Sequence, residues 1–408
     1  MIRDLRLRIL IVLLFASLPI AVFGGLALAF ICAGSAAIAL TSVRNLDFRI
    51  LAGNGSTIIL VGFVVLLGWS LVTLQWTLNE KAALSVWIRA ILLISSSGVL
   101  MIFAADMEKN LTLERFISYG FILALALAFF EYITDGLIIR TIESFILGHK
   151  EYIPKISNMD RGACYLSLMF WAAAAYFRDD RKKFAILWLA TLIVLTRLVS
   201  LSADMGFLAG TAAFIFVHAQ AEKKFDLPIT AVLIFIIIAF PIINLFTNPP
   251  AIGELHILPL SSLHRLYIWQ FSMGKIMEHP LLGWGFDASP FIPGGHDLIA
   301  GRSQDYWRYL PLHTHNSIIQ LWLELGILGP ILLAVIFAGA VFAVRKSSLP
   351  VGAKASLTAI IIGYFTIGLT GFGIWQFWWI GAGFLSLAAM LAASYNIDSS
   401  ASASLQKS

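Results

Sequence analysis

A run of 32 residues without one charged side chain, ILIVLLFASLPIAVFGGLALAFICAGSAAIAL at positions 9–40, decides the fold class of this 408-residue chain. An apolar helix needs about 20 residues to cross a bilayer, so the run is too long for one upright helix. Gly24 and Gly25 stand in its middle, where a tight turn fits. The run therefore predicts two helices that form a hairpin inside a membrane.

The whole chain has the same character, with 59% hydrophobic and 12% charged residues. Soluble domains contain roughly 45–50% apolar residues and about a quarter charged ones. The composition therefore excludes a soluble enzyme, a nucleic-acid-binding protein and a disordered protein. It predicts an all-α polytopic membrane protein with about twelve transmembrane helices. After the hairpin, the expected spans are 58–76, 84–104, 116–140, 159–177, 184–200, 205–219, 228–246, 317–344, 355–371 and 374–394.

The lysines and arginines indicate the orientation. With twelve spans and a cytoplasmic N-terminus, 17 of the 28 basic residues fall on the cytoplasmic side and eight on the other side. The densest basic run, 178–183, then lies inside, as the positive-inside rule requires. An eleven-span chain would place either the basic N-terminal cluster or the later basic loops outside. We therefore expect both termini in the cytoplasm and the N-terminal run as a retained anchor.

Four regions follow from this topology: a transmembrane bundle over 1–246, a long outer loop over 247–316, further transmembrane helices over 317–394, and a disordered cytoplasmic tail over 395–408. Within the loop, apolar residues recur at three- and four-residue spacing, which predicts an amphipathic helix from Leu260 to His279. The residues that define this apolar face are Leu263, Leu266, Trp269 and Met273.

Three arginines, Arg89, Arg161 and Arg197, lie inside apolar runs, each near the outer end of its helix. A single arginine at this depth can reach the headgroups or form a structural ion pair. Three at one depth on one side favour a shared anion site in a protein-lined cavity. Because arginine binds phosphate through two parallel hydrogen bonds, a lipid carrying phosphate is the expected guest.

Histidines are concentrated at the same face. His313 and His315 stand where the loop re-enters the membrane, and a His-x-His pair can be a metal site, a structural pair or a general base. Asp297 and Asp305 complete no recognised metal-ligand spacing, so no metal site is expected. Six of the eight histidines lie in the loop: His256, His264, His279, His296, His313 and His315.

Two sequence motifs of this region match a known family. The first motif that resembles the family signature is His315-Asn316, followed by Glu324-Leu-Gly326 and Gly329. The second lies upstream and consists of Arg265-Leu-Tyr-Ile-Trp269, followed by His279-Pro-Leu-Leu-Gly283-Trp-Gly285. The family is that of the O-antigen ligases and O-antigen polymerases. The motifs lie between residues 265 and 329, and the twelve-span layout with one long loop agrees over the whole chain.

This resemblance implies a metal-independent glycosyl transfer, without cofactor, at the periplasmic face of the bacterial inner membrane. The donor is a glycan on undecaprenyl diphosphate. The acceptor is a sugar hydroxyl, either of lipid A-core in a ligase or of another lipid-linked glycan in a polymerase; nucleic acid is no partner. By the same resemblance, His315 is the base and Arg265 binds the diphosphate. The expected supporting residues are His313, Asn316, Glu324 and Trp269.

One stretch departs from the family pattern. Members often carry a Ser-Arg-Gly-like sequence before the long loop, whereas this chain has Ser-Ala-Asp-Met-Gly at 202–206. Arg161 or Arg197 is therefore expected to supply a second diphosphate contact, with Arg89 as a further candidate. Asp204, within this stretch, is expected to pair with Arg197 instead of touching substrate.

The leading functional hypothesis is a ligase, and a polymerase is the alternative within the same chemistry. A transporter or flippase of lipid-linked sugars is the alternative from another class. Transporters are expected to show paired half-sequences and ionisable groups near mid-membrane. Here no repeat is visible, and the ionisable groups gather at one face. The tryptophans at 375, 378 and 379 are interpreted as an interfacial aromatic belt. The pair Glu131 and Asp135 can help to bind the acceptor or be solvated at the interface, and the solvated interpretation is favoured.

Overall fold

The computed structural model describes residues 2–41, 53–107, 111–146, 159–220, 224–246, 260–300 and 307–394. Within these ranges the chain is helical and contains no strand, which confirms the expected all-α class. The helices are α1 (Ile2–Gly24), η1 (Gly25–Ala27), α2 (Leu28–Leu40), α3 (Asn54–Thr73), α4 (Glu80–Ala105), α5 (Leu111–Ile133), α6 (Leu137–Thr141), η4 (Ile142–Ile146), α7 (Asp160–Ala174), η6 (Ala175–Phe177), α8 (Arg181–Arg197), α9 (Leu201–Gln220), α10 (Asp226–Phe246), α11 (Leu260–Glu278), η7 (Ser289–Phe291), α12 (Ser317–Leu325), α13 (Leu328–Lys346), α14 (Val351–Gly368) and α15 (Phe377–Ser394).

The first apolar run forms the predicted hairpin. α1 ends at Gly24, one short 3-10 turn follows, and α2 begins at Leu28. A Cβ on Gly34 of α2 would lie 3.9 Å from the side chain of Leu13 on α1, so the second helix runs back along the first.

Nine segments of the described ranges are long and apolar enough to cross a membrane. One of them contains α1 and α2 together. α7 and α8, with 15 and 17 residues, are shorter than a full span. The chain is therefore a multi-pass membrane protein, and the number of twelve crossings stays a prediction.

The most deeply buried element is α7. All its residues from 162 to 174 are buried, and the helix packs against α1, α5, α9, α14 and α15. A helix that is buried on every side needs neighbours all around it. A second apolar core joins α3, α10, α13 and α14. Most of the helices that carry the predicted site residues near their ends pack into these two cores.

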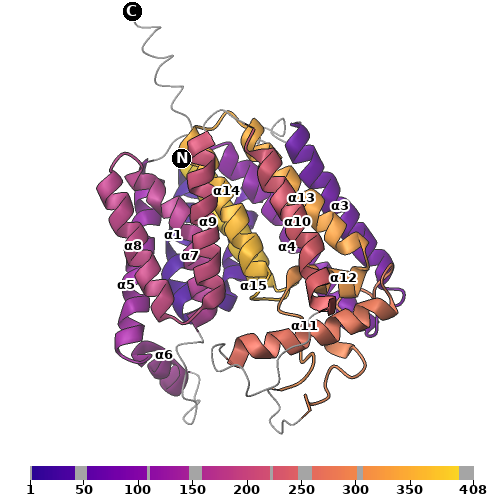
Figure 1. Cartoon of the computed structure of the whole chain (residues 1–408). Coiled ribbons are helices and arrows are strands. Elements are labelled where there is room, and N and C mark those ends of the chain that lie inside the picture. Colours follow the sequence, from indigo (N-terminus) through magenta and orange to yellow (C-terminus); the bar gives the residue numbers. More distant parts are fainter. Residues whose placement is uncertain are drawn as a thin grey trace, which may run out of the picture.

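Two ion pairs join segments that the sequence assigns to the cytoplasmic side. Arg178 donates to the buried carboxylate of Glu114 at 3.0 Å, and Arg345 lies 2.6 Å from Asp226. The segments carrying these four residues therefore meet at one end of the bundle. The start of α1 lies at that end, and α11 lies at the opposite end (Figure 1).

The helix predicted over 317–344 is broken. α12 ends at Leu325, the next residue Gly326 has a positive φ of +66°, and α13 begins at Leu328. A Cβ on Gly326 would collide with the carbonyl oxygen of Leu281, and one on Gly329 would collide with that of Leu321. These two glycines therefore allow the sharp corner between α12 and α13.

Candidate functional site

The amphipathic helix α11 covers the end of the bundle opposite the start of α1 (Figure 1). It agrees with the predicted helix to within one residue, and its buried face includes Trp269. The indole of Trp269 donates a hydrogen bond to the carbonyl of Thr314 at 2.9 Å. Arg265, one turn earlier on α11, is half-buried. The helix therefore brings Arg265 to the segment that carries His313 and His315.

Asn316 fixes the position of this segment. Its side-chain oxygen caps α12 by accepting hydrogen bonds from the N–H groups of Ile318 and Ile319, both at 2.9 Å. Its amide nitrogen donates to the carbonyl of Leu369 at 2.8 Å. Asn316 is fully buried, so it ties α12 to the end of α14 without facing open space.

His315 has a defined tautomer. Its Nδ1 lies 2.8 Å from the carbonyl oxygen of Gly371. A carbonyl only accepts hydrogen bonds, so Nδ1 carries the proton and Nε2 keeps a lone pair. The backbone of His315 has a φ of +53°, an uncommon value for a residue with a Cβ. Such strain persists where the surroundings fix the conformation, which occurs often at functional sites.

Burial and neighbouring charge keep His315 neutral. Burial lowers its pKa to about 4; the hydrogen bond to Gly371 opposes this shift, and the charges of Arg265 and His264 add to it. At neutral pH the imidazole is therefore unprotonated at Nε2. An uncharged imidazole in this state can accept a proton.

His313 packs against His315 and is held by its own neighbours. It is 7% exposed, and its ring lies 4.2 Å from that of His315 between centroids. Its Nδ1 is 3.1 Å from the backbone nitrogen of His315, and its Nε2 is 2.9 Å from the amide of Gln376. Burial lowers the pKa of His313 well below its usual value, so this ring is neutral too.

The segment 371–378, between α14 and α15, contacts most of the predicted site residues. It was not predicted to be part of the site, although it contains a polar residue, Gln376, next to three aromatic ones. The contacts are Gly371 with His315, Gln376 with His313, Trp375 with Glu324, Phe377 with Arg89, and Trp378 with Arg161.

The aromatic belt predicted for this segment is wrong. Trp375, Trp378 and Trp379 are 6%, 3% and 1% exposed, so they do not face an interface. Their indoles have buried partners: Trp375 donates to Glu324 at 2.6 Å, and Trp379 stacks on the ring of Tyr364 at 4.2 Å. A sequence pattern alone does not distinguish a tryptophan at the interface from one that bonds a buried acceptor.

Arg265 and Arg161 converge on one carboxylate. The charges of both arginines act on Asp160, the first residue of α7, and Ser200 donates a hydrogen bond to that carboxylate. Ser200 follows Val199, a β-branched residue with a φ of +57° in the turn between α8 and α9. The charge of Arg265 also reaches both histidines. The helices α7 and α11 thus bring two arginines to the side of the histidine pair.

Arg197 lies apart from this group. It is exposed at the end of α8, with its guanidinium 6.0 Å from the ring centroid of Tyr132. The expected pairing with Asp204 is not formed among the described residues, since the buried oxygen of Asp204 has no hydrogen-bond partner there. Arg197 is therefore exposed at the end of α8, and among the described residues no contact joins it to the histidines.

Arg89 lies beside a different set of residues. Its guanidinium is 5.0 Å from the ring centroid of Phe377 and donates to the hydroxyl of Ser85 at 3.2 Å. Its charge acts on Asp287. Arg89 and Arg161 thus lie against successive residues of α15, Phe377 and Trp378, and each has its own acidic neighbour.

Glu324 is a buried anchor for the turn that follows α11. Its carboxylate accepts hydrogen bonds from Trp375 at 2.6 Å, from Gln320 at 3.0 Å and from the backbone of Asp287 at 3.1 Å, and also from the hydroxyl of Ser289. It is 0% exposed. Glu324 therefore acts on the site through the segments that it holds.

The same turn pairs with α12 through backbone groups. The N–H groups of Trp284 and Gly285 donate to the carbonyls of Leu323 and Glu324, both at 2.9 Å. Gly283 has a φ of +72°, and a Cβ there would come within 2.5 Å of the Glu324 carbonyl. The motif glycines are therefore needed for this close backbone approach.

Glu131 is likewise structural and not solvated. It is 0% exposed and accepts hydrogen bonds from the backbone of Ile138 at 2.8 Å and Ile139 at 3.1 Å, so it caps the short helix α6. Asp135, its predicted companion, is solvent-exposed and lies 3.8 Å from Arg140. The prediction of two solvated acids is wrong for Glu131 and right for Asp135.

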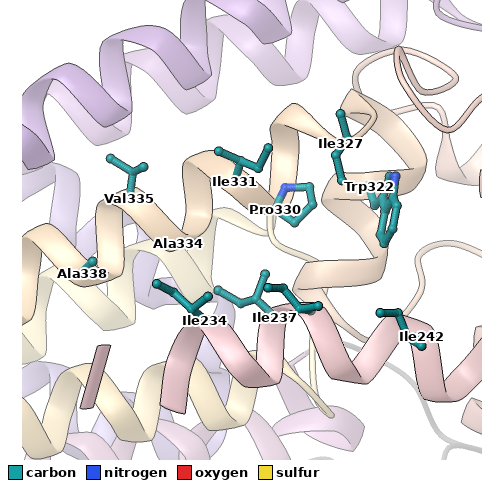
Figure 2. Close-up of a pocket in the computed structure, with 11 residues that line it drawn as sticks. Ile234, Ile237, Ile242, Trp322, Ile327, Pro330, Ile331, Ala334, Val335 and Ala338 are labelled. Atoms are coloured by element: carbon teal, nitrogen blue, oxygen red, sulfur yellow. The ribbon is translucent and has the colours of Figure 1, made fainter. Parts of the chain in front are cut away.

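An apolar cavity lies outside this polar region. It is a groove of about 330 Å³ between α10 and α13, and only apolar side chains line it (Figure 2). Trp322 of α12 closes one end, and Ala338 of α13 marks the other. Since α12 begins directly after the histidine segment, the groove starts within one short helix of the candidate site.

These observations describe a multi-pass membrane protein with a neutral histidine pair and two arginines at one end of its bundle. The comparisons with known proteins agree. Residues 184–334 match the O-antigen ligase family. A Rickettsia conorii protein, provisionally named a polysaccharide ligase, is 33% identical over 294 residues, which cover 70% of this chain and 68% of that protein. A similarly named Rickettsia prowazekii protein is 30% identical over 293 residues, which cover 70% of this chain and 69% of that protein.

A third relative, from Rickettsia felis and with the same provisional name, is 28% identical over 329 residues, or 79% of this chain and 77% of its own. The chain belongs to the O-antigen ligase family and is an enzyme of the glycosyltransferase-like ligase kind. The matched region contains α8–α12 and the first residues of α13, and thus the histidines, Arg265 and Glu324.

Proposed function

We propose that this enzyme transfers a polysaccharide from undecaprenyl diphosphate to a sugar hydroxyl of lipid A-core, at the periplasmic face of the bacterial inner membrane. The observation that carries the proposal is the hydrogen bond from His315 Nδ1 to the Gly371 carbonyl, which leaves Nε2 as a proton acceptor beside Arg265. Both termini are then cytoplasmic, on the side of the ion pairs of Arg178 and Arg345.

In the transfer, His315 Nε2 takes the proton of the acceptor hydroxyl. The hydroxyl oxygen attacks the anomeric carbon of the donor and forms the new glycosidic bond. The bond from that carbon to the diphosphate oxygen breaks, and its electron pair stays on the diphosphate. Arg265 and Arg161 stabilise the charge that develops on this leaving group. Arg197 is the further arginine at the outer end of the bundle that the diphosphate can reach.

Donor binding also activates the base. In the free enzyme, the positive charge of Arg265 helps to lower the pKa of His315. A bound diphosphate offsets this charge, so the pKa of His315 rises when the donor is present, although burial still holds it below its usual value. His315 is then a stronger base in the donor complex than in the free enzyme.

The apolar groove between α10 and α13 suits the isoprenoid chain of the donor. Its lining contains no charged residue, and it begins at Trp322, on the short helix that Asn316 caps (Figure 2). A diphosphate held by Arg265 would therefore have an apolar surface nearby for its lipid. Burial of apolar chain contributes about 0.8 kcal/mol per methylene group.

Lipopolysaccharide gels test the function directly. A strain lacking the gene is compared with the same strain complemented by the wild-type enzyme. A ligase predicts loss of the whole polysaccharide ladder, with bare lipid A-core, and its return on complementation. A core carrying one repeat would identify a polymerase. An unchanged ladder would contradict both.

A further inference from the structure

The turn between α11 and η7 presents a carboxyl group that the proposed mechanism does not use. Asp287 has a φ of +55°, and its N–H is held by the carboxylate of Glu324 at 3.1 Å. Its own side chain forms no hydrogen bond within the described parts of the chain. Burial raises the pKa of Asp287 to about 7; the charge of Glu324 adds to this shift and that of Arg89 opposes it.

Arg89 is held beside this carboxyl. Its Nε donates to the Ser85 carbonyl at 3.0 Å and its Nη2 to the Ser85 hydroxyl at 3.2 Å, while Phe377 covers one face of the guanidinium. The guanidinium is therefore oriented by its own helix and by α15. Arg89 remains exposed, so it can bind a ligand together with Asp287.

The charges differ between the two parts of the site. Near the histidines, Arg265 and Arg161 act on the single carboxylate of Asp160. Near the turn, the charge of the single cation Arg89 acts on Asp287, and so does the buried carboxyl group of Glu324. A diphosphate is attracted more strongly to the first set, which has two cations for one carboxyl group, than to the second set, which has one cation for two. A neutral ligand rich in hydroxyl groups fits the second set, because carboxylate and guanidinium then accept and donate hydrogen bonds.

We propose that Asp287 and Arg89 form the subsite that binds the sugar ring of the acceptor, apart from the arginines that hold the donor diphosphate. This inference rests on the proposed function, and it moves Arg89 from donor binding to acceptor binding. Asp287 accepts hydrogen bonds from sugar hydroxyls, and Arg89 donates to ring or hydroxyl oxygens. The two residues therefore set acceptor specificity and leave donor binding unchanged.

Steady-state kinetics of the purified full-length enzyme test this subsite. The donor is the undecaprenyl-diphosphate-linked glycan of the source strain, and the acceptor is its lipopolysaccharide lacking O-antigen. Asp287→Asn and Asp287→Gly both suit a positive φ. Each should raise the acceptor KM about tenfold or more, as expected for loss of a hydrogen bond to a charged group, with the donor KM unchanged. Asp297→Asn, an exposed control in the same loop, should change neither. An unchanged acceptor KM, or an equal rise for the donor, overturns the subsite.

A binding measurement separates failure of the subsite from failure of the proposed function. Deacylated core oligosaccharide is titrated into the wild-type enzyme and into Asp287→Asn. Weaker binding by the variant supports the subsite, and equal binding, or no binding to either protein, overturns it. If the wild type transfers nothing to lipid A-core, the proposed function fails, and this titration still decides whether the subsite binds the sugar.

Discussion

The Nδ1 atom of His315 lies 2.8 Å from the carbonyl oxygen of Gly371, a residue 56 positions later in the chain. This contact joins the segment before α12 to the segment after α14. It selects the tautomer of His315 and leaves the lone pair on Nε2. This tautomer is therefore fixed only when two segments distant in sequence are packed together.

The pH dependence of kcat/KM and of kcat should differ, because the pKa of His315 differs between the free enzyme and the donor complex. His315 works unprotonated, so activity rises with pH through its pKa. In the free enzyme the pKa is about 4, so kcat/KM for the donor should fall only as the pH approaches 4. The kcat value reports the bound complex, where the diphosphate raises the pKa, and it should fall at a higher pH.

Asp287→Asn serves as the control for these profiles, because it removes a group whose pKa is about 7. In this variant, kcat should still fall at a higher pH than kcat/KM for the donor. If kcat and kcat/KM fall at the same pH, the bound diphosphate does not change the pKa of His315, and the proposed coupling is contradicted.

Replacing Arg265 by lysine should reduce kcat/KM for the donor by more than about tenfold. Lysine keeps the charge but cannot donate two parallel hydrogen bonds to a diphosphate. Steady-state kinetics with the lipid-linked donor measure this change. Arg181→Lys, at the opposite end of the bundle, provides the matched control and should keep wild-type rates. Wild-type activity in Arg265→Lys would argue against bidentate binding.

The helices were predictable where length and periodicity of apolar residues decide them. The hairpin over 9–40 and the amphipathic helix α11 are local features, and both predictions were correct. The break at Gly326 was missed because its cause is the distant carbonyl of Leu281. An apolar sequence continues across that corner, and Gly326, Gly329 and Pro330 are the local signals there.

Glu324→Ala should destabilise the protein by about 3 kcal/mol or more, because it leaves several buried donors without an acceptor. The donors are those of Trp375, Gln320, Ser289 and the Asp287 backbone. Thermal unfolding in detergent measures the effect. The control Glu278→Gln removes only a surface pair with Lys275 and should leave the unfolding temperature nearly unchanged. Equal temperatures for both variants would contradict an anchoring role.

Filling the apolar groove should weaken the binding of long-chain donors. Ala334→Phe on α13 occupies the groove and should raise the KM of an undecaprenyl-linked donor, but not that of a farnesyl-linked donor with the same glycan. Val64→Phe, on an exposed face of α3, is the control and should change neither value. An equal effect of Ala334→Phe on both donors would exclude the groove as the isoprenoid site.

The candidate site was predictable only in part. The histidines and Arg265 were recognisable from motif residues close together in sequence. Asp160 and Asp287 were missed because each becomes notable only beside an arginine from another helix. Asp160-Arg161 at the start of an apolar run was the available signal for the first. Asp287 had none, because its positive φ is visible only in the structure.

The most direct test of the account is complementation of the deletion strain with His315→Ala. His296→Ala is the control, since His296 is exposed and its ring bonds the nearby Pro290 carbonyl. We predict that His315→Ala reaches the membrane at the wild-type level, leaves lipid A-core bare and leaves the polysaccharide on its lipid carrier, whereas His296→Ala restores the ladder. Loss of a general base reduces rates by about 10²–10⁴-fold, so the ladder should be absent. A normal ladder in His315→Ala would contradict the account.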